Sequence, residues 1–366
     1  MANLSASTGK DDHPLASTGS GESLIGRYLP RLAVGLLLAV LVVSGLALFS
    51  DVRQLGSAFR QFDWSLAAPV LLLTLANYAL RFGKWEVYLR RVGIPRMELG
   101  TSALIFLAGF SMSLTPGKVG EVIKGVLVRR RTGAPISRTA AVIAAERMTD
   151  GLAMLALAAI GLTQFSYGRP ILALTILLVI AVILVLQRPR LILHALARFE
   201  GIPLVGKTLV HAHHFLEASN VLLRPSLLGG AVAVGIVSWG MECAALFLIL
   251  TGLGLDPSWH LLLVATFVLS VSSVFGAISM LPGGLGVAEA SVAAMLLLLI
   301  DDPTMTKGVA AAATLLVRFS TLWFGILLGF VALAMLQRTR RVSSEDAFEL
   351  TTAPGSTTET TIGGSR

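Results

Sequence analysis

Six apolar runs of this 366-residue chain are close to the roughly 20 residues that a helix needs to cross a bilayer. They are residues 32–50, 64–80, 138–165, 171–187, 226–253 and 307–337. Only 14% of the residues are charged, whereas a soluble domain carries about 25%. The longest hydrophilic insert, residues 188–225, is too short for a hydrophobic core of its own. The sequence therefore predicts an all-α integral membrane protein.

Two further apolar regions are interrupted by proline and glycine. Residues 99–128 are broken at Pro116 and Gly117, and residues 259–300 are broken at Pro282, Gly283 and Gly284. Proline removes a backbone donor and blocks helix continuation, so each region predicts two half-length helices around a break. We expect each region to enter and leave the membrane on the same side. The predicted fold is six full spans plus two such re-entrant helical hairpins.

The Lys and Arg residues predict the orientation, because cytoplasmic loops hold the excess of these residues. With the amino terminus inside, most of the 29 Lys and Arg residues fall in cytoplasmic segments. These include Arg81, Lys84, Lys124 and the run 129–131. The outside loops would hold Arg53, Arg60, Arg169 and Lys307. Both termini are then cytoplasmic, and the hairpins insert from opposite sides as inverted repeats, over about residues 99–165 and 259–337.

The ends of the chain differ in composition from the membrane domain, which we assign to residues 32–337. Residues 1–31 are rich in Ser, Thr and Gly, and residues 338–366 are rich in Thr, so we expect a disordered cytoplasmic leader and tail. No clear small-residue cleavage motif follows the first apolar run, which predicts a retained helix.

The two breaks share the pattern P-G-x-x-G followed by an acid. The first reads Pro116-Gly117-Lys118-Val119-Gly120-Glu121, and the second reads Pro282-Gly283-Gly284-Leu285-Gly286 with Glu289 soon after. Such breaks free backbone groups, which a bilayer tolerates only where the chain is buried in protein or lines a polar cavity. Paired interrupted segments in the two halves of a transporter point to its substrate site. The alternative is that both breaks merely end helices at the membrane surface.

Charged residues inside the apolar runs also indicate a site, because each costs on the order of 2.5 to 3.5 kcal/mol at a helix centre. Glu146, Arg147 and Asp150 share one run, while Glu242 and Arg318 lie in two others and need partners from other helices. We hypothesise that Arg147 and Arg318 bind a lipid phosphate from opposite sides of a central cavity. The acids that would orient them, or grip a cationic part of the headgroup, are Glu121, Glu146, Asp150, Glu242 and Glu289. The alternative is a set of ion pairs that only fixes helix packing.

Other features argue against several function classes. The net charge of +8 is spread over short stretches between apolar runs, so we expect no nucleic-acid partner. The single cysteine, Cys243, excludes a cysteine-rich metal site, and we read His211, His213 and His214 as a solvated loop. We therefore predict no metal and no cofactor.

Three stretches resemble a known family. They are RFGKWEVYLRRVG at 81–93, the block 115–150 with PGKVGEVIKG and AAERMTD, and LPGGLGVAEA at 281–290. Together they resemble the flippase-like membrane domain of the lysylphosphatidylglycerol synthase family, over about residues 32–337. Residues Glu121, Glu146, Arg147, Asp150 and Glu289 match the family pattern directly. Lys118 stands where a basic residue is expected, although lysine lacks the bidentate phosphate geometry of arginine.

The resemblance implies translocation of a lipid without its synthesis. The lipid would be an aminoacyl-phospholipid or an isoprenoid-phosphate-linked sugar in a cell (inner) membrane, and the protein would not be an enzyme. A homo-oligomer and a lipid-synthesising partner enzyme both stay open. Two alternatives also stay open: a lipid-modifying transferase that uses Glu146 and Asp150 as acid and base, and a small-ion transporter.

Overall fold

The computed structural model describes residues 37, 40–45, 48, 50–113, 115, 121–163, 177, 219 and 221–352. The regular structure within these ranges is helical throughout, with no strand. Five of its helices are long and apolar enough to cross a membrane: Trp64–Arg91, Pro225–Gly252, Trp259–Ile278, Pro282–Leu299 and Lys307–Arg338. The prediction of an all-α membrane protein is therefore confirmed. Of the expected spans, residues 32–50 and 171–187 lie largely outside the described residues.

The first described span is longer than expected. Helix η1 (Trp64–Leu66) leads into α3 (Ala67–Arg91), so the helix continues well past the boundary at residue 80. The boundary was wrong because Arg81 and Lys84, which we assigned to a cytoplasmic segment, are buried within α3. Before η1, the Asp63 carboxylate accepts hydrogen bonds from the hydroxyl and backbone N–H of Ser65, and these lower the pKa of Asp63.

The helices on either side of the first break are short, as expected. They are α4 (Leu99–Ala108) with η2 (Gly109–Met112), and α5 (Ile123–Thr132). Around the second break, α11 (Trp259–Ile278) is followed by η5 (Pro282–Gly284) and α12 (Val287–Leu299). With 20 residues, α11 is not the half-length helix that we expected. No proline interrupts it, so the helix continues until Ser279.

Three long helices complete the bundle. They are α6 (Ile136–Leu162), α10 (Pro225–Gly252) and the continuous helix formed by α13 (Lys307–Arg318), the π-helix η6 (Phe319–Trp323) and α14 (Phe324–Thr352). Helix α14 continues to Thr352, beyond residue 338, where we placed the start of the tail. Extending a helix that has already formed is far easier than starting one. Helix α2 (Val52–Gln61), which precedes η1, packs against α13.

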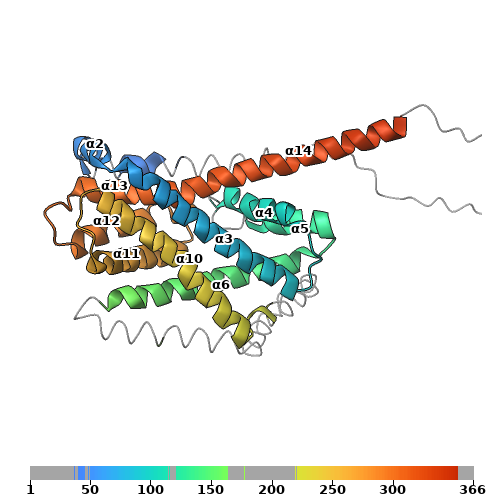
Figure 1. The fold of residues 1–366 in the computed structure, drawn as a ribbon, viewed down its shortest axis with the longest axis horizontal. Coiled ribbons are helices and arrows are strands. Elements are labelled where there is room, and N and C mark those ends of the chain that lie inside the picture. The colour runs from blue at the N-terminus through green and yellow to red at the C-terminus, as the bar shows by residue number, and fades with distance from the viewer. Residues whose placement is uncertain are drawn as a thin grey trace, which may run out of the picture.

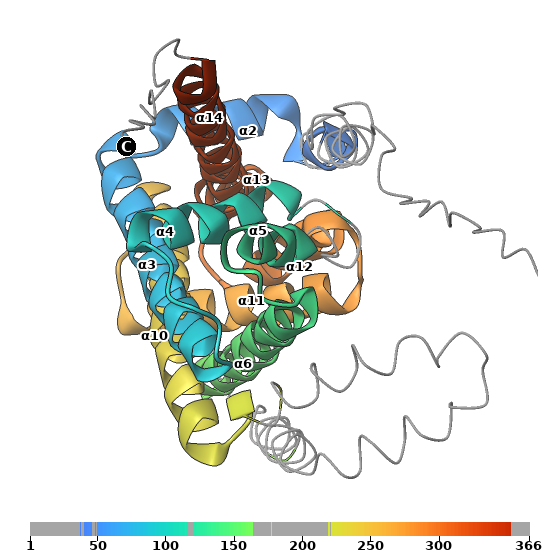
Figure 2. The ribbon, with the colours of Figure 1, turned by 90° about the vertical axis from the view of Figure 1, so that its right-hand side faces the viewer.

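The helices around the two breaks occupy opposite ends of the bundle. In Figure 1, α4 and α5 lie in the right half and α11, α12 and α13 in the left half, while α3, α6 and α10 run between the two ends. In Figure 2, a view at right angles to the first, α3 and α10 lie on one side and α11 and α12 lie on the other. Helix α4 packs against α14, and α11 packs against α6.

Both of these packings depend on a glycine. A Cβ atom at Gly161 of α6 would lie 2.7 Å from the backbone nitrogen of Phe267 in α11. A Cβ atom at Gly329 of α14 would lie 2.9 Å from the carbonyl oxygen of Leu107 in α4. Contacts this short leave no room for a side chain, so each long helix needs glycine where a helix of the other region crosses it.

Candidate functional site

A stripe of polar residues runs along one face of α3. Asn77, Arg81, Lys84 and Tyr88 follow each other at alternating four- and three-residue spacing, which places them on one side of a helix. All four are buried. Arg81 and Lys84 were therefore wrongly assigned to a cytoplasmic loop. The helical spacing of the stripe was the signal that could have identified them.

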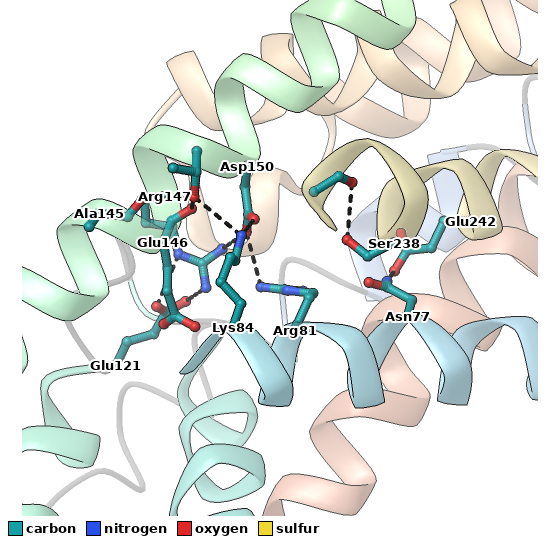
Figure 3. Close-up of polar contacts among 12 residues, drawn as sticks. Asn77, Arg81, Lys84, Glu121, Ala145, Glu146, Arg147, Asp150, Ser238 and Glu242 are labelled. Carbon is teal, nitrogen blue, oxygen red and sulfur yellow. Dashed lines mark hydrogen bonds and ion pairs between the residues drawn. The ribbon is translucent and has the colours of Figure 1, made fainter. Parts of the chain in front are cut away.

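Asp150 of α6 receives the two cations of this stripe. The Lys84 ammonium lies 2.5 Å from Asp150 Oδ1, and the Arg81 guanidinium lies 3.3 Å from Oδ2. Lys84 also donates to the hydroxyl of Thr149 at 3.2 Å. Figure 3 shows Arg81 and Lys84 pointing from α3 toward Asp150 on the facing helix. The three charges thus tie α3 to α6 inside the bundle.

Glu146, one turn before Asp150, pairs with a lysine of α5. Lys124 Nζ lies 2.9 Å from Glu146 Oε2, and both side chains are almost fully buried. Lys124, which we also assigned to the cytoplasmic segments, is therefore part of the interior. Its ammonium lies 4.7 Å from the ring centre of Trp85, and its stem lies against Gly109, where a Cβ would be 2.8 Å from Lys124 Cδ. Glycine at 109 makes room for this lysine.

Arg147 forms a two-point pair with Glu121, the acid after the first break. The Nε to Oε2 distance is 3.1 Å and the second nitrogen lies 2.9 Å from Oε1. The Glu121 side chain is 4% exposed, whereas that of Arg147 is 28% exposed. The remaining break residues of this region, Pro116, Gly117, Lys118 and Gly120, lie outside the described residues.

Arg318 forms the corresponding pair with Glu289, the acid after the second break. Arg318 Nε lies 2.5 Å from Glu289 Oε1, and a second nitrogen donates to the carbonyl oxygen of Gly283 at 3.1 Å. The other Glu289 oxygen accepts from the backbone N–H of Gly286 at 2.7 Å. Gly283, Gly284 and Gly286 all have positive φ angles. Side chains thus bind two of the backbone groups that the break frees, as the pattern predicts.

The two arginines have equivalent positions in their helices. Arg147 lies about three turns after Ile136, where α6 begins, and Arg318 lies about three turns after Lys307, where α13 begins. Each arginine pairs with the glutamate of its own break. Glu289 lies in α12 and Arg318 in α13, so Arg318 has the partner from another helix that we expected.

Glu242 of α10 is a further buried acid of the interior. Its carboxylate accepts a hydrogen bond from the amide nitrogen of Asn77 on α3 (Figure 3), so its partner also comes from another helix. The charges of Arg81, Asp150 and Arg318 all act on Glu242. Glu242 therefore connects the charged groups of the first region electrostatically with those of the second.

An apolar groove runs along the helix that carries Arg318, although Arg318 itself does not line it. Its volume is about 330 Å³, and it is formed by η1, α3, α10 and the α13–η6–α14 helix. Leu316, Phe319 and Ser320, the sequence neighbours of Arg318, contribute to its wall, together with Trp64 and Trp323. The π-helix η6 shapes this wall, and the hydroxyl of Tyr78 donates to its Thr321 carbonyl at 2.5 Å. Helical irregularities of this kind are frequent at functional sites.

Within the described ranges, no group of three or more His, Cys, Asp or Glu residues has an arrangement that could hold a metal ion. Cys243 is a buried free thiol. The histidines 211, 213 and 214 lie outside the described residues.

These features define a multi-pass membrane protein with ion pairs in its interior. The family model for the lysylphosphatidylglycerol synthase TM region matches residues 34–329, and the chain belongs to this family. The resemblance predicted from the three motifs is thereby confirmed.

Curated relatives cover most of the chain. A UPF0104 membrane protein of Methanothermobacter thermautotrophicus is 26% identical over 331 residues, which are 82% of this chain and 94% of the relative. A second UPF0104 membrane protein of the same organism is 23% identical over 278 residues, or 70% of this chain and 80% of the relative. The glycosyltransferase AglD of Haloferax volcanii is 25% identical over 129 residues, which are 35% of this chain and 21% of AglD.

Proposed function

We propose that this protein moves a lipid with an anionic polar headgroup across the membrane, as a flippase-type translocase rather than an enzyme. The observation that carries the proposal is the pair of arginines, Arg147 and Arg318. Each lies inside a long apolar helix and remains partly exposed, at 28% and 19%, while its glutamate partner is buried. An arginine is expensive at this position and suits bidentate binding of a phosphate.

The depth of the arginines supports a site at the bilayer midplane. Each lies about 16 Å along the axis from the start of its helix, at 1.5 Å per residue. The hydrocarbon core is about 30 Å thick, so this is about half its depth. Arg318 also contacts Gly283 and Glu289, which brings the second break to the same depth. A break at half depth favours a re-entrant hairpin over a helix end at the surface.

The directions of the helices support inverted repeats. In Figure 1, α6 runs from right to left, whereas the α13–η6–α14 helix runs from left to right. The basic residues 129–131 end α5 at the right-hand end, which the positive-inside rule assigns to the cytoplasm. We therefore propose six full spans plus two oppositely inserted hairpins in a cell membrane, with both termini cytoplasmic.

The apolar groove favours a lipid over a small ion as the substrate. A water-soluble ion needs only a polar path, whereas a lipid needs an apolar surface for its chains beside the site for its headgroup. Leu316 and Phe319 of the groove wall belong to the same continuous helix as Arg318, on a face that Arg318 does not share. In our proposal, the headgroup of an aminoacyl-phospholipid or an isoprenoid-phosphate-linked sugar reaches the arginines while its chains stay in this groove and the surrounding lipid.

The transferase alternative is less well supported. Glu146 and Asp150, its candidate acid and base, are both in ion pairs with buried lysines. Each carboxylate is thus already engaged by a cation from a neighbouring helix. The relative AglD is named a glycosyltransferase, but the shared segment is only 21% of that protein. We propose transport without a chemical change of the lipid.

A reconstitution experiment tests the proposal. Full-length protein is placed in phosphatidylcholine vesicles that contain phosphatidylglycerol with a fluorescent label on its headgroup. A membrane-impermeant quencher added outside removes the fluorescence of every labelled lipid in the outer leaflet, and this loss is followed over time. We expect lipid to reach the outer leaflet, with no change in its mass. Arg147→Gln and Arg318→Gln should slow this movement. Arg90→Gln is the matched control, because Arg90 is 53% exposed at the end of α3. Normal movement by both arginine variants would refute the proposal.

A further inference from the structure

Glu242 differs from the other acids buried in the spans. Each of the others has a lysine or arginine nitrogen within 4 Å, and they are Glu121, Glu146, Asp150 and Glu289. Among the described residues, no cationic nitrogen comes this close to Glu242, although its side chain is only 5% exposed. Its hydrogen-bond donor is the neutral amide of Asn77. An ionised carboxylate is poorly compensated in this position.

Asn77 has an unused acceptor. Its amide nitrogen donates to Glu242, but its carbonyl oxygen Oδ1 is buried and has no hydrogen-bond partner within the described part of the chain. An ionised carboxylate cannot donate a hydrogen bond, whereas a protonated carboxyl has one O–H donor. A proton on the free oxygen of Glu242 would therefore give Asn77 Oδ1 its missing donor. Acid and amide would then be joined by two hydrogen bonds.

The charged and titratable groups around Glu242 come from three of the helices packed against α10. Helix α3 contributes Tyr78 and Arg81, α6 contributes Asp150, and α13 contributes Arg318. Helix α11 carries no charged residue between positions 261 and 278, and Cys243 is adjacent on α10 itself. Arg81 and Arg318 are the two cations whose field reaches Glu242. An anion bound to Arg318 would cancel part of that field and favour the protonated form.

We propose that Glu242 is a proton-binding site linked to the anionic headgroup, so that one proton and one phosphate enter the interior together. This inference rests on the proposed function and adds the proton as a second ligand. The proton passes from water to the free Glu242 oxygen, no covalent bond to the lipid changes, and the proton leaves when the lipid leaves. Because linkage is reciprocal, the headgroup must bind more tightly when Glu242 is protonated.

The pH dependence of lipid binding tests this linkage. Half-saturation by labelled phosphatidylglycerol is measured in the vesicle assay over a pH series from mildly acidic to mildly alkaline. For the wild type, we expect the apparent affinity to rise as the pH falls, by up to about tenfold per pH unit, since one proton is bound with each lipid. Glu242→Gln imitates the protonated acid in charge and hydrogen bonding. This variant should bind with high affinity at every pH.

Glu86→Gln is the matched control. Glu86 is a mostly buried acid at the end of α3 that pairs with Arg90, outside the interior site. This variant should keep the pH dependence of the wild type. A wild type that moves lipid with a pH-independent affinity, or a Glu242→Gln variant that keeps the full dependence, would overturn the linkage and leave the proposed function intact.

Infrared spectroscopy tests the proton site without lipid transport. The wild type should gain the band of a protonated carboxyl on acidification, and this band should be missing from Glu242→Gln and present in Glu86→Gln. Absence of the band from the wild type refutes the proton site even if lipid moves. Presence of the band in a protein that moves no lipid would support the proton site and count against the proposed function instead.

Discussion

The two regions around the breaks hold the same Arg–Glu pair in different surroundings. In the first, Arg147 and Glu121 adjoin Asp150 in a network of charged side chains from α3, α5 and α6. In the second, Arg318 and Glu289 are held largely by backbone groups of the break. The first pair therefore depends on the packing of three helices, whereas the second depends on the conformation of a few glycines.

This difference predicts which region can rearrange. Moving the first pair would separate buried opposite charges, which is costly in a medium of low dielectric constant. Moving the second pair requires backbone rotation at Gly283 and Gly286, and glycine permits such rotation. We expect the first region to act as a fixed framework and the second to change during transport.

The largest effect should follow from breaking the network of the first region. Lys124→Met leaves Glu146 as an uncompensated buried charge, and we expect it to lower the free energy of unfolding by about 3 to 5 kcal/mol. Glu289→Gln in the second region should cost less, because Arg318 is 19% exposed and can be hydrated. Thermal unfolding in detergent measures both.

The double variant Lys124→Met/Glu146→Gln is the control for this comparison. It removes both charges, so most of the lost stability should return. If Lys124→Met were as stable as the wild type, the buried network would not be the framework of the first region.

The next largest effect should come from the two glycine crossings, and it should be similar in both regions. Gly161→Ala and Gly329→Ala each introduce a Cβ into a backbone contact, which typically costs about 1 to 3 kcal/mol of stability. The melting temperature of each purified variant is the measurement. Gly151→Ala is the control on α6, because in the described part of the chain no atom of another helix lies within 4 Å of its added Cβ. A loss at one crossing only would mean that the regions are not packed equivalently.

The spans were predictable because their signal is local. Residues 226–253 and 307–337 correspond closely to the helices Pro225–Gly252 and Lys307–Arg338. The prediction failed at Arg81 and Lys84. The positive-inside rule counts Lys and Arg residues along the sequence, and it assigned both residues to a cytoplasmic segment. Asp150 of α6 lies beside these two cations only in the folded protein. Its negative charge makes the burial of Arg81 and Lys84 tolerable.

The site was predictable in its members but not in its pairs. The repeated motif identified Glu121 and Glu289, and the apolar context identified Arg147 and Arg318. No spacing rule pairs residues that are 26 or 29 positions apart in different segments of the chain. Lys124 escaped detection because it lies in a basic stretch, where a positive charge has a simpler explanation.

A smaller effect, on transport rather than on stability, should distinguish arginine from a simple positive charge. Lysine keeps the charge but cannot bind two groups in a planar fork. We expect Arg147→Lys and Arg318→Lys each to slow lipid movement by about tenfold, which corresponds to about 1.4 kcal/mol. The vesicle assay measures this rate, and Arg90→Lys serves as the control. Equal rates for Arg318→Lys and the wild type would show that only charge is needed there.

The smallest effect should come from the second break itself. Gly283 has φ 62° and ψ 9°, in the left-handed region, so Gly283→Ala should lower stability by about 1 kcal/mol. Asparagine tolerates this conformation, and Gly283→Asn should remain close to the wild type in the same unfolding experiment. The transport rates of the two variants then decide what the break does. If the Gly283 carbonyl positions Arg318, alanine should slow lipid movement and asparagine should not. If both variants move lipid at the wild-type rate while only alanine loses stability, the break ends a helix and the two regions do not differ in the way proposed.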